Sequence, residues 1–341
     1  MEQRDALALS LLPGVGAVRY AELIADFGSA ARALDDAVFA DAVAARARAD
    51  AACADAERLG ARVLVRGGAD YPEELEHLHD PPPVLFAIGG PDAIAPPACA
   101  IVGTRGATPY GERMTREIAG ALARAGVSIL SGLARGIDGT AHRAALDAMG
   151  RTAAVLGTGV DLAYPASHRA LHARIAASGL LLSEELPGDR ANAGSFPKRN
   201  RVLAALAQVT IVVEAPRQSG ALITAIHALD LGRTVAAVPG PIDAPTSAGS
   251  NQLLRDGATM ICDVADALQL FALSAPRARE PVLQTRAERA IWEALGAGAA
   301  ASIDELCLRA GWSARECLVA VSALEIQGAI SCELTGEIRR R

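Results

Sequence analysis

Six short apolar runs alternate with helical patterns between residues 98 and 268. Most of the runs end in glycine or serine just before a helix is expected, and their composition indicates strands that are buried on both faces. The runs are ACAIVG (98–103), VSILSG (127–132), TAAVLGTG (152–159), LLLSEEL (180–186), VTIVVEA (209–215) and TVAAVPG (234–240). This alternation predicts an α/β fold, with a doubly wound, mostly parallel sheet and helices on both sides. Ligands bind such folds at the carboxyl ends of the strands, so the loops after these runs are where function is expected.

The segment before this sheet predicts a small helical domain. Residues 1–60 are rich in alanine, and residues 11–29 have the form of two helices joined by a glycine turn, a helix-hairpin-helix. Such a turn can offer backbone N–H groups to a phosphate. A plain helical interaction domain is the alternative, and a net charge of −4 over residues 1–60 favours it. Residues 61–95 are transitional, with strands expected at 62–65 and 84–89.

The segment after the sheet predicts a winged helix, because three helical patterns are followed by a short hairpin. The domains expected from the whole pattern are 1–60 (helical), 61–272 (Rossmann-like), 273–285 (linker) and 286–341 (winged helix).

Composition adds three constraints. Hydrophobic residues make up 51% of the chain but aromatic residues only 3%, so the core is expected to consist of small aliphatic side chains. No run of eighteen apolar residues occurs, and the first residues lack the pattern of a signal peptide, so a cytoplasmic protein without a membrane span is expected. The six cysteines form no CxxC pair and are expected to be small buried hydrophobes.

The charge balance argues against a generally basic DNA-binding surface. The net charge is −6, and none of the three regions 1–60, 61–280 and 281–341 is basic as a whole. Binding to nucleic acid would therefore need a local patch of cations.

Glycine-rich loops follow the first two strands of the sheet. The first loop contains Gly103, Thr104 and Arg105, and the next helix is expected to begin at Thr108-Pro109, with threonine as its N-cap. A glycine turn that leads into a helix N-terminus can bind an anion, and an arginine beside it matches the geometry of phosphate.

The second loop offers backbone N–H groups in the same way. It contains Ser131, Gly132 and Gly136, and Asp138 is expected to cap the helix that follows. His142 in that helix is expected to be a surface or buried neutral side chain.

The most informative stretch lies between the fourth and fifth strands. It contains Phe196, Lys198, Arg199, Asn200 and Arg201. Cations neutralise phosphates, and an aromatic ring can stack on an unpaired base. Pro197 is expected to start a helix, which puts the cations in a first turn whose macrodipole prefers anions. This placement suggests that the cations serve a ligand. The alternative is a solvated charged turn with the phenylalanine in the core.

The loop after the fifth strand supplies a fourth anion site at the same edge of the sheet. Ser219 is expected to cap the helix that starts at Gly220. Four such loops at one edge support a phosphate-bearing ligand better than any single loop does.

Motifs of common enzymes are absent from the chain. It contains no GxxxxGK[ST], no GxSxG and no HExxH. His168 and His172 lie four residues apart, but no cysteine or carboxylate completes a zinc site, so a solvated helix face is expected. No catalytic residue, metal or cofactor is predicted.

The motifs taken together resemble the DprA/Smf family of DNA-processing proteins. The segments that carry the resemblance are VGTRGATPYG, SGLARGIDGTAHRAAL, AVLGTGVDLAYPASHRAL, LLSEELPG, FPKRNR, VVEAPRQSGALITA and VPGPID. They follow the family's order over about residues 70–268, and the flanking segments resemble its variable end domains.

The resemblance implies an extended Rossmann-like core that forms a homodimer, binds single-stranded DNA and loads the recombinase RecA during natural transformation, without catalysis. In the family, the arginine of the first loop and the basic residues of the FPxRNR stretch line the DNA pocket. These correspond to Arg105 and to Lys198, Arg199 and Arg201.

Two other functions remain open. A phosphoribohydrolase-like enzyme on the same kind of fold would use Glu214 as its acid, although the surrounding loop resembles that of such enzymes only loosely. A winged-helix transcription factor would use residues 313–328 as a recognition helix. That helix carries Arg315 as its only cation, which favours a protein-contact module instead.

Overall fold

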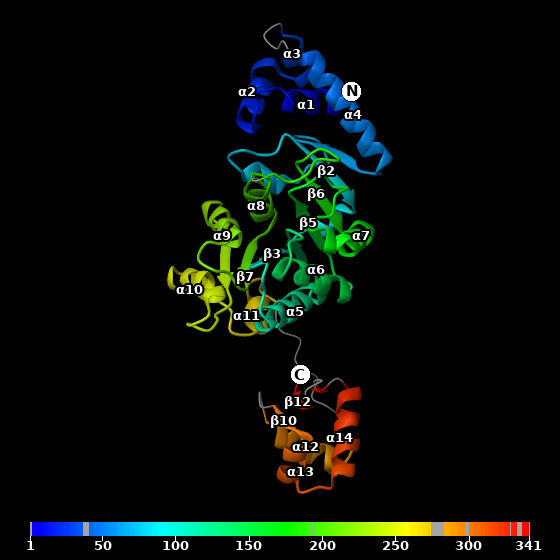
Figure 1. Cartoon of the computed structure of the whole chain (residues 1–341), viewed down its shortest axis with the longest axis vertical. Helices are drawn as coiled ribbons and strands as arrows, with labels where there is room; N and C mark the ends of the chain where they lie inside the picture. Colours follow the sequence, from blue (N-terminus) through cyan, green and yellow to red (C-terminus); the bar gives the residue numbers. More distant parts are fainter. Residues whose placement is uncertain are drawn as a thin grey trace. The chain divides into compact units, whose positions relative to one another are not determined.

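The computed structural model describes residues 2–36, 41–192, 194–273, 283–296, 300–327, 329–332 and 336–340. The chain forms two compact units, Met1–Ser274 and Ala275–Arg341 (Figure 1). Of the linker expected at 273–285, residues 274–282 lie outside the described part of the chain.

Nine strands form a single sheet in the described part of the first unit, in the order β1-β2-β6-β5-β4-β3-β7-β8-β9. The pairs β1–β2 and β2–β6 are antiparallel, and the other neighbouring strands are parallel. The strands are β1 (Arg62–Val65), β2 (Val84–Gly89), β3 (Ala98–Val102), β4 (Ser128–Ser131), β5 (Thr152–Leu156), β6 (Leu180–Ser183), β7 (Val209–Val212), β8 (Thr234–Ala237) and β9 (Thr259–Met260). The six apolar runs are β3 to β8, which confirms the doubly wound, mostly parallel sheet, and β9 is an addition to it.

The α-helices of the first unit are α1 (Glu2–Ser10), α2 (Ala17–Phe27), α3 (Ala30–Asp35), α4 (Ala42–Arg58), α5 (Pro109–Arg124), α6 (Ile137–Asp147), α7 (Arg169–Ser178), α8 (Ser195–Leu206), α9 (Gly220–Asp230), α10 (Ala248–Arg255) and α11 (Val264–Gln269). Short 3-10 helices are η1 (Glu73–His77), η2 (Pro91–Ile94), η3 (Ala166–His168) and η4 (Pro245–Ser247). None of the described helices has the length and apolar character that a membrane crossing requires.

The central strand β3 is buried on both faces. Ala98, Ala100 and Val102 pack against α8 and α9, whereas Cys99 and Ile101 pack against α5 and α6. Successive side chains of a strand point to opposite faces, so a continuous apolar run fits a strand covered by helices on both sides. Figure 1 shows the two sets of helices around the strands.

The chain winds outward from β3 in both directions. Strands β4, β5 and β6 follow on one side, and β7, β8 and β9 on the other. The loops after β3, β4 and β7 therefore meet at a topological switch point, where a crevice opens at the carboxyl edge of such a sheet.

The N-terminal helices and the sheet share one hydrophobic core. The buried alanines and leucines of α1 to α4 pack in a cluster that also contains Val84 and Phe86 of β2 and Val160 of the loop after β5. The turn between α1 and α2 ends at Gly16, which is the N-cap of α2, as the helix-hairpin-helix pattern of residues 11–29 predicts.

The second unit is a winged helix. Its elements are α12 (Arg286–Leu295), β10 (Ala301–Ser302), α13 (Ile303–Ala310), α14 (Ala314–Ile326), β11 (Ile330–Cys332) and β12 (Glu337–Arg340). The three helices and the hairpin agree with the sequence pattern, and β10 adds a third strand to the wing, in the order β10-β12-β11. Each helix begins with a capping box: the hydroxyl of the N-cap serine or threonine accepts a hydrogen bond from the backbone N–H of a glutamate three residues later, and the glutamate carboxylate accepts one from the backbone N–H of the N-cap residue.

All six cysteines lie in the described residues and are free. Cys99 and Cys317 are buried, as expected for small hydrophobes, but Cys262 and Cys332 are exposed. The expectation of burial is therefore wrong for these two, because each lies at an edge of its unit's fold, next to the edge strand β9 or at the end of β11.

Candidate nucleic-acid interface

A cavity of about 330 Å³ opens at the switch point of the sheet. Its walls come from the loop after β3, the loop after β4, helix α8 and the start of α9. Eight of the predicted site residues line it, namely Gly103, Thr104, Arg105, Phe196, Arg199, Asn200, Ser219 and Gly220. The carboxyl edge of the sheet thus brings together side chains that are far apart in the sequence.

The first two loops pack closely against each other because glycines leave room for the backbone. A side chain at Gly103 would overlap Ile137 and come within 2.8 Å of the carbonyl oxygen of Glu214. Gly136 has a positive φ of 73°, and a side chain there would meet the backbone of Thr104 and Arg105. These close approaches hold Arg105 at the rim of the cavity.

The exposed guanidinium of Arg105 lies over the ring of Phe196, with 5.2 Å between its central carbon and the ring centroid. This cation–π contact joins the first loop to helix α8. The cavity rim therefore carries a cation and an aromatic ring side by side, the two groups that unpaired nucleotides need for their phosphates and bases.

Arg199 lies inside the cavity wall and is only 7% exposed. Its guanidinium donates hydrogen bonds to the carbonyl oxygen of Val155 and, at 3.2 Å, to Oδ1 of Asn200. Burial lowers the pKa of Arg199 to about 10, so the group stays charged at neutral pH. Asn200 in turn donates to the carbonyl oxygen of Gly220 at 3.1 Å, which ties α8 to the start of α9.

Asp138 balances part of this buried charge. Its Oδ2 accepts hydrogen bonds from the backbone N–H groups of Gly132 (3.1 Å) and Ala134 (3.4 Å). Burial raises the pKa of Asp138, and the neighbouring Arg199 opposes that shift. The expected N-cap role is wrong, because Gly136 is the N-cap of α6 and the carboxylate instead fixes the loop before the helix.

The start of α9 forms the far wall of the cavity. The Ser219 hydroxyl accepts a hydrogen bond from the backbone N–H of Ala221 at 3.2 Å, as the N-cap pattern predicts. The first N–H groups of a helix carry partial positive charge, so this end of α9 suits an anion.

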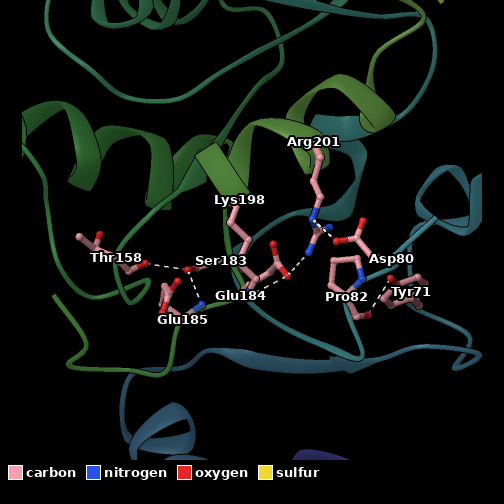
Figure 2. Close-up of polar contacts among 9 residues, drawn as sticks. All are labelled: Tyr71, Asp80, Pro82, Thr158, Ser183, Glu184, Glu185, Lys198 and Arg201. Carbon is pink, nitrogen blue, oxygen red and sulfur yellow. Dashed lines mark hydrogen bonds and ion pairs between the residues drawn. The ribbon is translucent and has the colours of Figure 1, made fainter. Parts of the chain in front are cut away.

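Two of the predicted cations do not reach the cavity. Lys198 and Arg201 lie on another face of α8, where both contact Oε2 of Glu184, at 3.5 Å and 2.7 Å (Figure 2). Arg201 also pairs with Asp80 at 3.1 Å. Arg201 is buried and Lys198 is about half exposed, so the three cations of the FPKRNR stretch do not form one surface.

The position of α8 explains part of this difference. The helix was expected to begin at Pro197, but it begins at Ser195 with Gly194 as its N-cap. Arg199 and Arg201 therefore lie beyond its first turn and Lys198 lies at the end of that turn, so the argument from the helix macrodipole does not hold for the three cations together.

Three further predicted residues support the cavity without lining it. The Ser131 hydroxyl is buried and donates to the carbonyl oxygen of Ile101 at 2.6 Å. Gly132 lies against the Arg199 guanidinium, which a larger side chain would overlap, and Gly136 packs against the first loop.

Glu214, the residue that the alternative enzyme would use as its acid, makes structural contacts. Glu214 is buried, and its Oε2 accepts hydrogen bonds from the backbone N–H (2.9 Å) and the hydroxyl (3.3 Å) of Thr108. Thr108 is the N-cap of α5, as predicted, so this carboxylate stabilises the beginning of a helix.

The solvated helix face expected for His168 and His172 is wrong, because both side chains are partly buried and contact backbone carbonyl oxygens. His168 and His172 contact the carbonyl oxygens of Leu133 (3.0 Å) and Val160 (2.9 Å). Within the described ranges, no group of three or more metal-ligating side chains could hold an ion. His142 is buried beside the Thr152 hydroxyl, and burial lowers its pKa to about 3, which agrees with a neutral buried histidine.

Sequence reasoning missed Tyr164, which lies beside Phe196 with 5.3 Å between the ring centroids. The available signal was its position on the loop after β5, at the same edge of the sheet as the four anion sites.

The fold and the cavity define a doubly wound, Rossmann-like protein with a cationic and aromatic site at its switch point, followed by a winged helix. Comparison with protein families gives a match over residues 62–272 to the model described as DNA recombination-mediator protein A. Residues 274–336 match the DprA winged helix domain. The chain belongs to the DNA recombination-mediator protein A family, which confirms the resemblance to DprA/Smf proteins.

Relatives with known names support this assignment. The chain is 44% identical over 260 residues to a putative DNA processing protein DprA of Mycobacterium tuberculosis, covering 74% of this chain and 67% of the relative. The solved structure of DprA from Streptococcus pneumoniae matches with a TM-score of 0.69 and 30% identity, covering 79% of this chain and 98% of that one.

A second solved structure, of DNA processing protein A from Helicobacter pylori, matches with a TM-score of 0.57 and 31% identity. It covers 62% of this chain and 95% of that one, and it is described as giving insight into a single-stranded DNA binding mode.

Proposed function

We propose that this protein binds single-stranded DNA in the switch-point cavity and acts in DNA processing and recombination without a catalytic step. The observation that carries the proposal is the convergence of Arg105, Arg199, Phe196 and the N-terminus of α9 in one cavity. The two guanidinium groups and the helix end would hold phosphates, while the ring would stack on an unpaired base.

The proposal also accounts for the net charge of −6. A cavity with two cations can neutralise a few phosphates, whereas duplex binding along a basic surface would require more positive charge. The single-stranded DNA described for the Helicobacter pylori relative is the same ligand class. In line with the family resemblance, we propose that the protein acts in the cytoplasm and delivers the bound strand to the recombinase RecA.

A salt titration that compares single-stranded with duplex DNA tests the proposal. We expect a preference for the single strand, with little dependence on sequence, and a slope of log affinity against log salt of about −1 to −2 per subunit, because the cavity holds two cations. Equal affinity for duplex DNA at matched salt would overturn the proposed function. Release of free base from nucleoside monophosphates would instead support the enzyme that the contacts of Glu214 disfavour.

Replacement of Arg105 by alanine should weaken binding of single-stranded DNA by about 1.5–3 kcal/mol, the typical contribution of a hydrogen bond to a charged group. The side chain is exposed on a loop, so its loss leaves no core cavity and the fold should persist.

Arg113→Ala is the matched control. Arg113 is also exposed and lies over an aromatic ring, 5.6 Å from the centroid of Tyr110, but it is on α5 and does not line the cavity. Fluorescence anisotropy with a labelled oligonucleotide measures both variants. An unchanged dissociation constant for Arg105→Ala would remove this residue from the site.

We further propose that the protein forms a homodimer through the surface of α9 and the edge strand β9. Ile226, Leu229 and Met260 are each more than half exposed, although they are large apolar side chains. Among the described strands, β9 ends the sheet with one edge unpaired, and α9 packs on β7 and on β8, the neighbour of β9.

Ile226→Asp should therefore convert the dimer to a monomer, because an unpaired charge would be buried in the interface. Sedimentation velocity at micromolar concentration distinguishes the two states, with Val43→Asp, an exposed apolar residue of α4, as the control. A wild-type protein that sediments as a single chain would contradict the proposed dimer.

A further inference from the structure

Tyr164 is a large aromatic side chain that is 49% exposed at the carboxyl edge of the sheet. Its ring lies 5.3 Å from that of Phe196, centroid to centroid, with an angle of 38° between the two planes. Gly157, on the same loop after β5, lies so close to Phe196 that an added side chain would begin 3.0 Å from the ring. The loop after β5 therefore packs closely against Phe196, and it places Tyr164 next to that ring.

Three planar groups follow one another at this place. The Arg105 guanidinium lies over Phe196, and Phe196 lies against Tyr164. Phe196 and Arg105 line the cavity, but Tyr164 does not. The ring of Tyr164 thus extends the aromatic surface from the cavity mouth towards solvent.

Exposure of this ring has no evident structural benefit. A tyrosine buries its apolar ring where the fold allows it, as Tyr71 does in the same unit. The exposed loop residue Arg135, one position before Gly136, adds a cation at the same edge. An accessible ring with cations nearby is the combination that holds unpaired bases and their phosphates.

We propose that Tyr164 is a second base-stacking residue, whose ring stacks on a base of the strand just outside the cavity. The inference rests on the proposed function and extends it: the bound strand contacts two aromatic platforms, Phe196 and Tyr164. Both platforms require bases whose faces are free, which a paired and stacked duplex does not offer. Tyr164 would therefore contribute to the preference for single strands.

The first test compares three variants by their affinity for a thymine oligonucleotide. Tyr164→Ala should weaken binding about tenfold, within the range measured for loss of one base–aromatic stack. Tyr164→Phe and Tyr164→Trp keep a ring and should bind as the wild type does. Equal binding by all three variants and the wild type overturns the inference.

Oligonucleotides with one abasic site separate stacking from a merely structural role. A scan of the lesion along the strand should find a position at which the wild type loses affinity and Tyr164→Ala does not. If Tyr164→Ala binds the intact strand and every abasic strand more weakly than the wild type by the same factor, the residue only shapes the loop. That result would show that the inference is wrong.

Photo-crosslinking with 5-iodouracil in the oligonucleotide locates the contact directly in the wild type. Trypsin releases residues 152–169 with Tyr164 as their only Phe, Tyr or Trp residue, and residues 191–198 with Phe196 as theirs. Crosslinks to both peptides support the inference, and crosslinks confined to 191–198 overturn it. Failure of the wild type to bind any single strand would instead overturn the proposed function and this inference with it.

Discussion

Replacement of Arg201 by methionine should lower the free energy of unfolding of the first unit by about 3–5 kcal/mol. Arg201 is 6% exposed and pairs with Glu184, whose side chain is also nearly buried. Burial raises the pKa of Glu184, while Arg201 and Lys198 oppose the shift. Removal of the arginine leaves this carboxyl group without its main partner in a site that disfavours its charge. The cost of the unpaired charge lowers the free energy of unfolding.

Lys198→Met is the matched control on the same helix. Lys198 contacts the same carboxylate oxygen, at 3.5 Å, but its side chain is 52% exposed. Solvent screens such a pair, so the loss should be no more than about 1 kcal/mol. A double variant, Arg201→Met with Glu184→Leu, should be more stable than Arg201→Met alone, because the buried carboxylate is then gone and the charges left without a partner, on Asp80 and Lys198, are about half exposed.

Urea unfolding measures these effects if the signal comes from the correct unit. Both tryptophans, Trp292 and Trp312, lie in the second unit, so their fluorescence reports the winged helix and should not change. Hydrogen exchange of α8 reports the first unit. A loss for Arg201→Met no larger than that for Lys198→Met would show that burial does not govern this ion pair.

Replacement of Arg199 by methionine should weaken binding of single-stranded DNA by about 2–5 kcal/mol, the range for loss of one partner of a buried charged contact. Arg199 lies in the cavity wall, where solvent screening is weak, so its attraction for a phosphate should exceed that of the exposed Arg105. The salt slope should also decrease by about one.

Gly132→Ala tests the same group without removal of any charge. The added methyl group would overlap the Arg199 guanidinium, the flexible end of its side chain, and should displace it from the cavity wall. Binding should weaken about tenfold, while the unfolding midpoint changes little. Gly106→Ala, on the Arg105 loop with open space around it, is the control and should bind normally. Full affinity in Gly132→Ala and Arg199→Met would exclude Arg199 from the site.

Much of the candidate site was predictable because its parts are local. Thr108 and Ser219 cap their helices as the sequence indicates, since a hydroxyl before a helical pattern satisfies N–H groups within the same turn. The convergence of Arg105, Phe196 and Ser219 followed from the parallel sheet, whose carboxyl ends meet at one edge.

The sequence did not predict in the same way which of the cations after Phe196 lines the cavity. Helical spacing puts Lys198 and Arg201 on one face of α8 and Arg199 on another, and that signal was present in the sequence. Which face meets the cavity depends on Glu184 and Asp80, which belong to other segments of the chain. Tyr164 was missed for the same reason, because its contact with Phe196 is made between two loops.

The sequence alone determined the layered α/β core, the winged helix and the edge of the sheet at which a ligand would bind. Those features follow from periodicity, caps and glycine turns, which act over a few residues. Only the tertiary structure decided that Arg199 faces the cavity, that Arg201 stabilises the core and that Asp138 fixes a loop. The physical reason is that burial of a charge is favourable only where partners from distant segments meet it, and sequence spacing does not specify those partners.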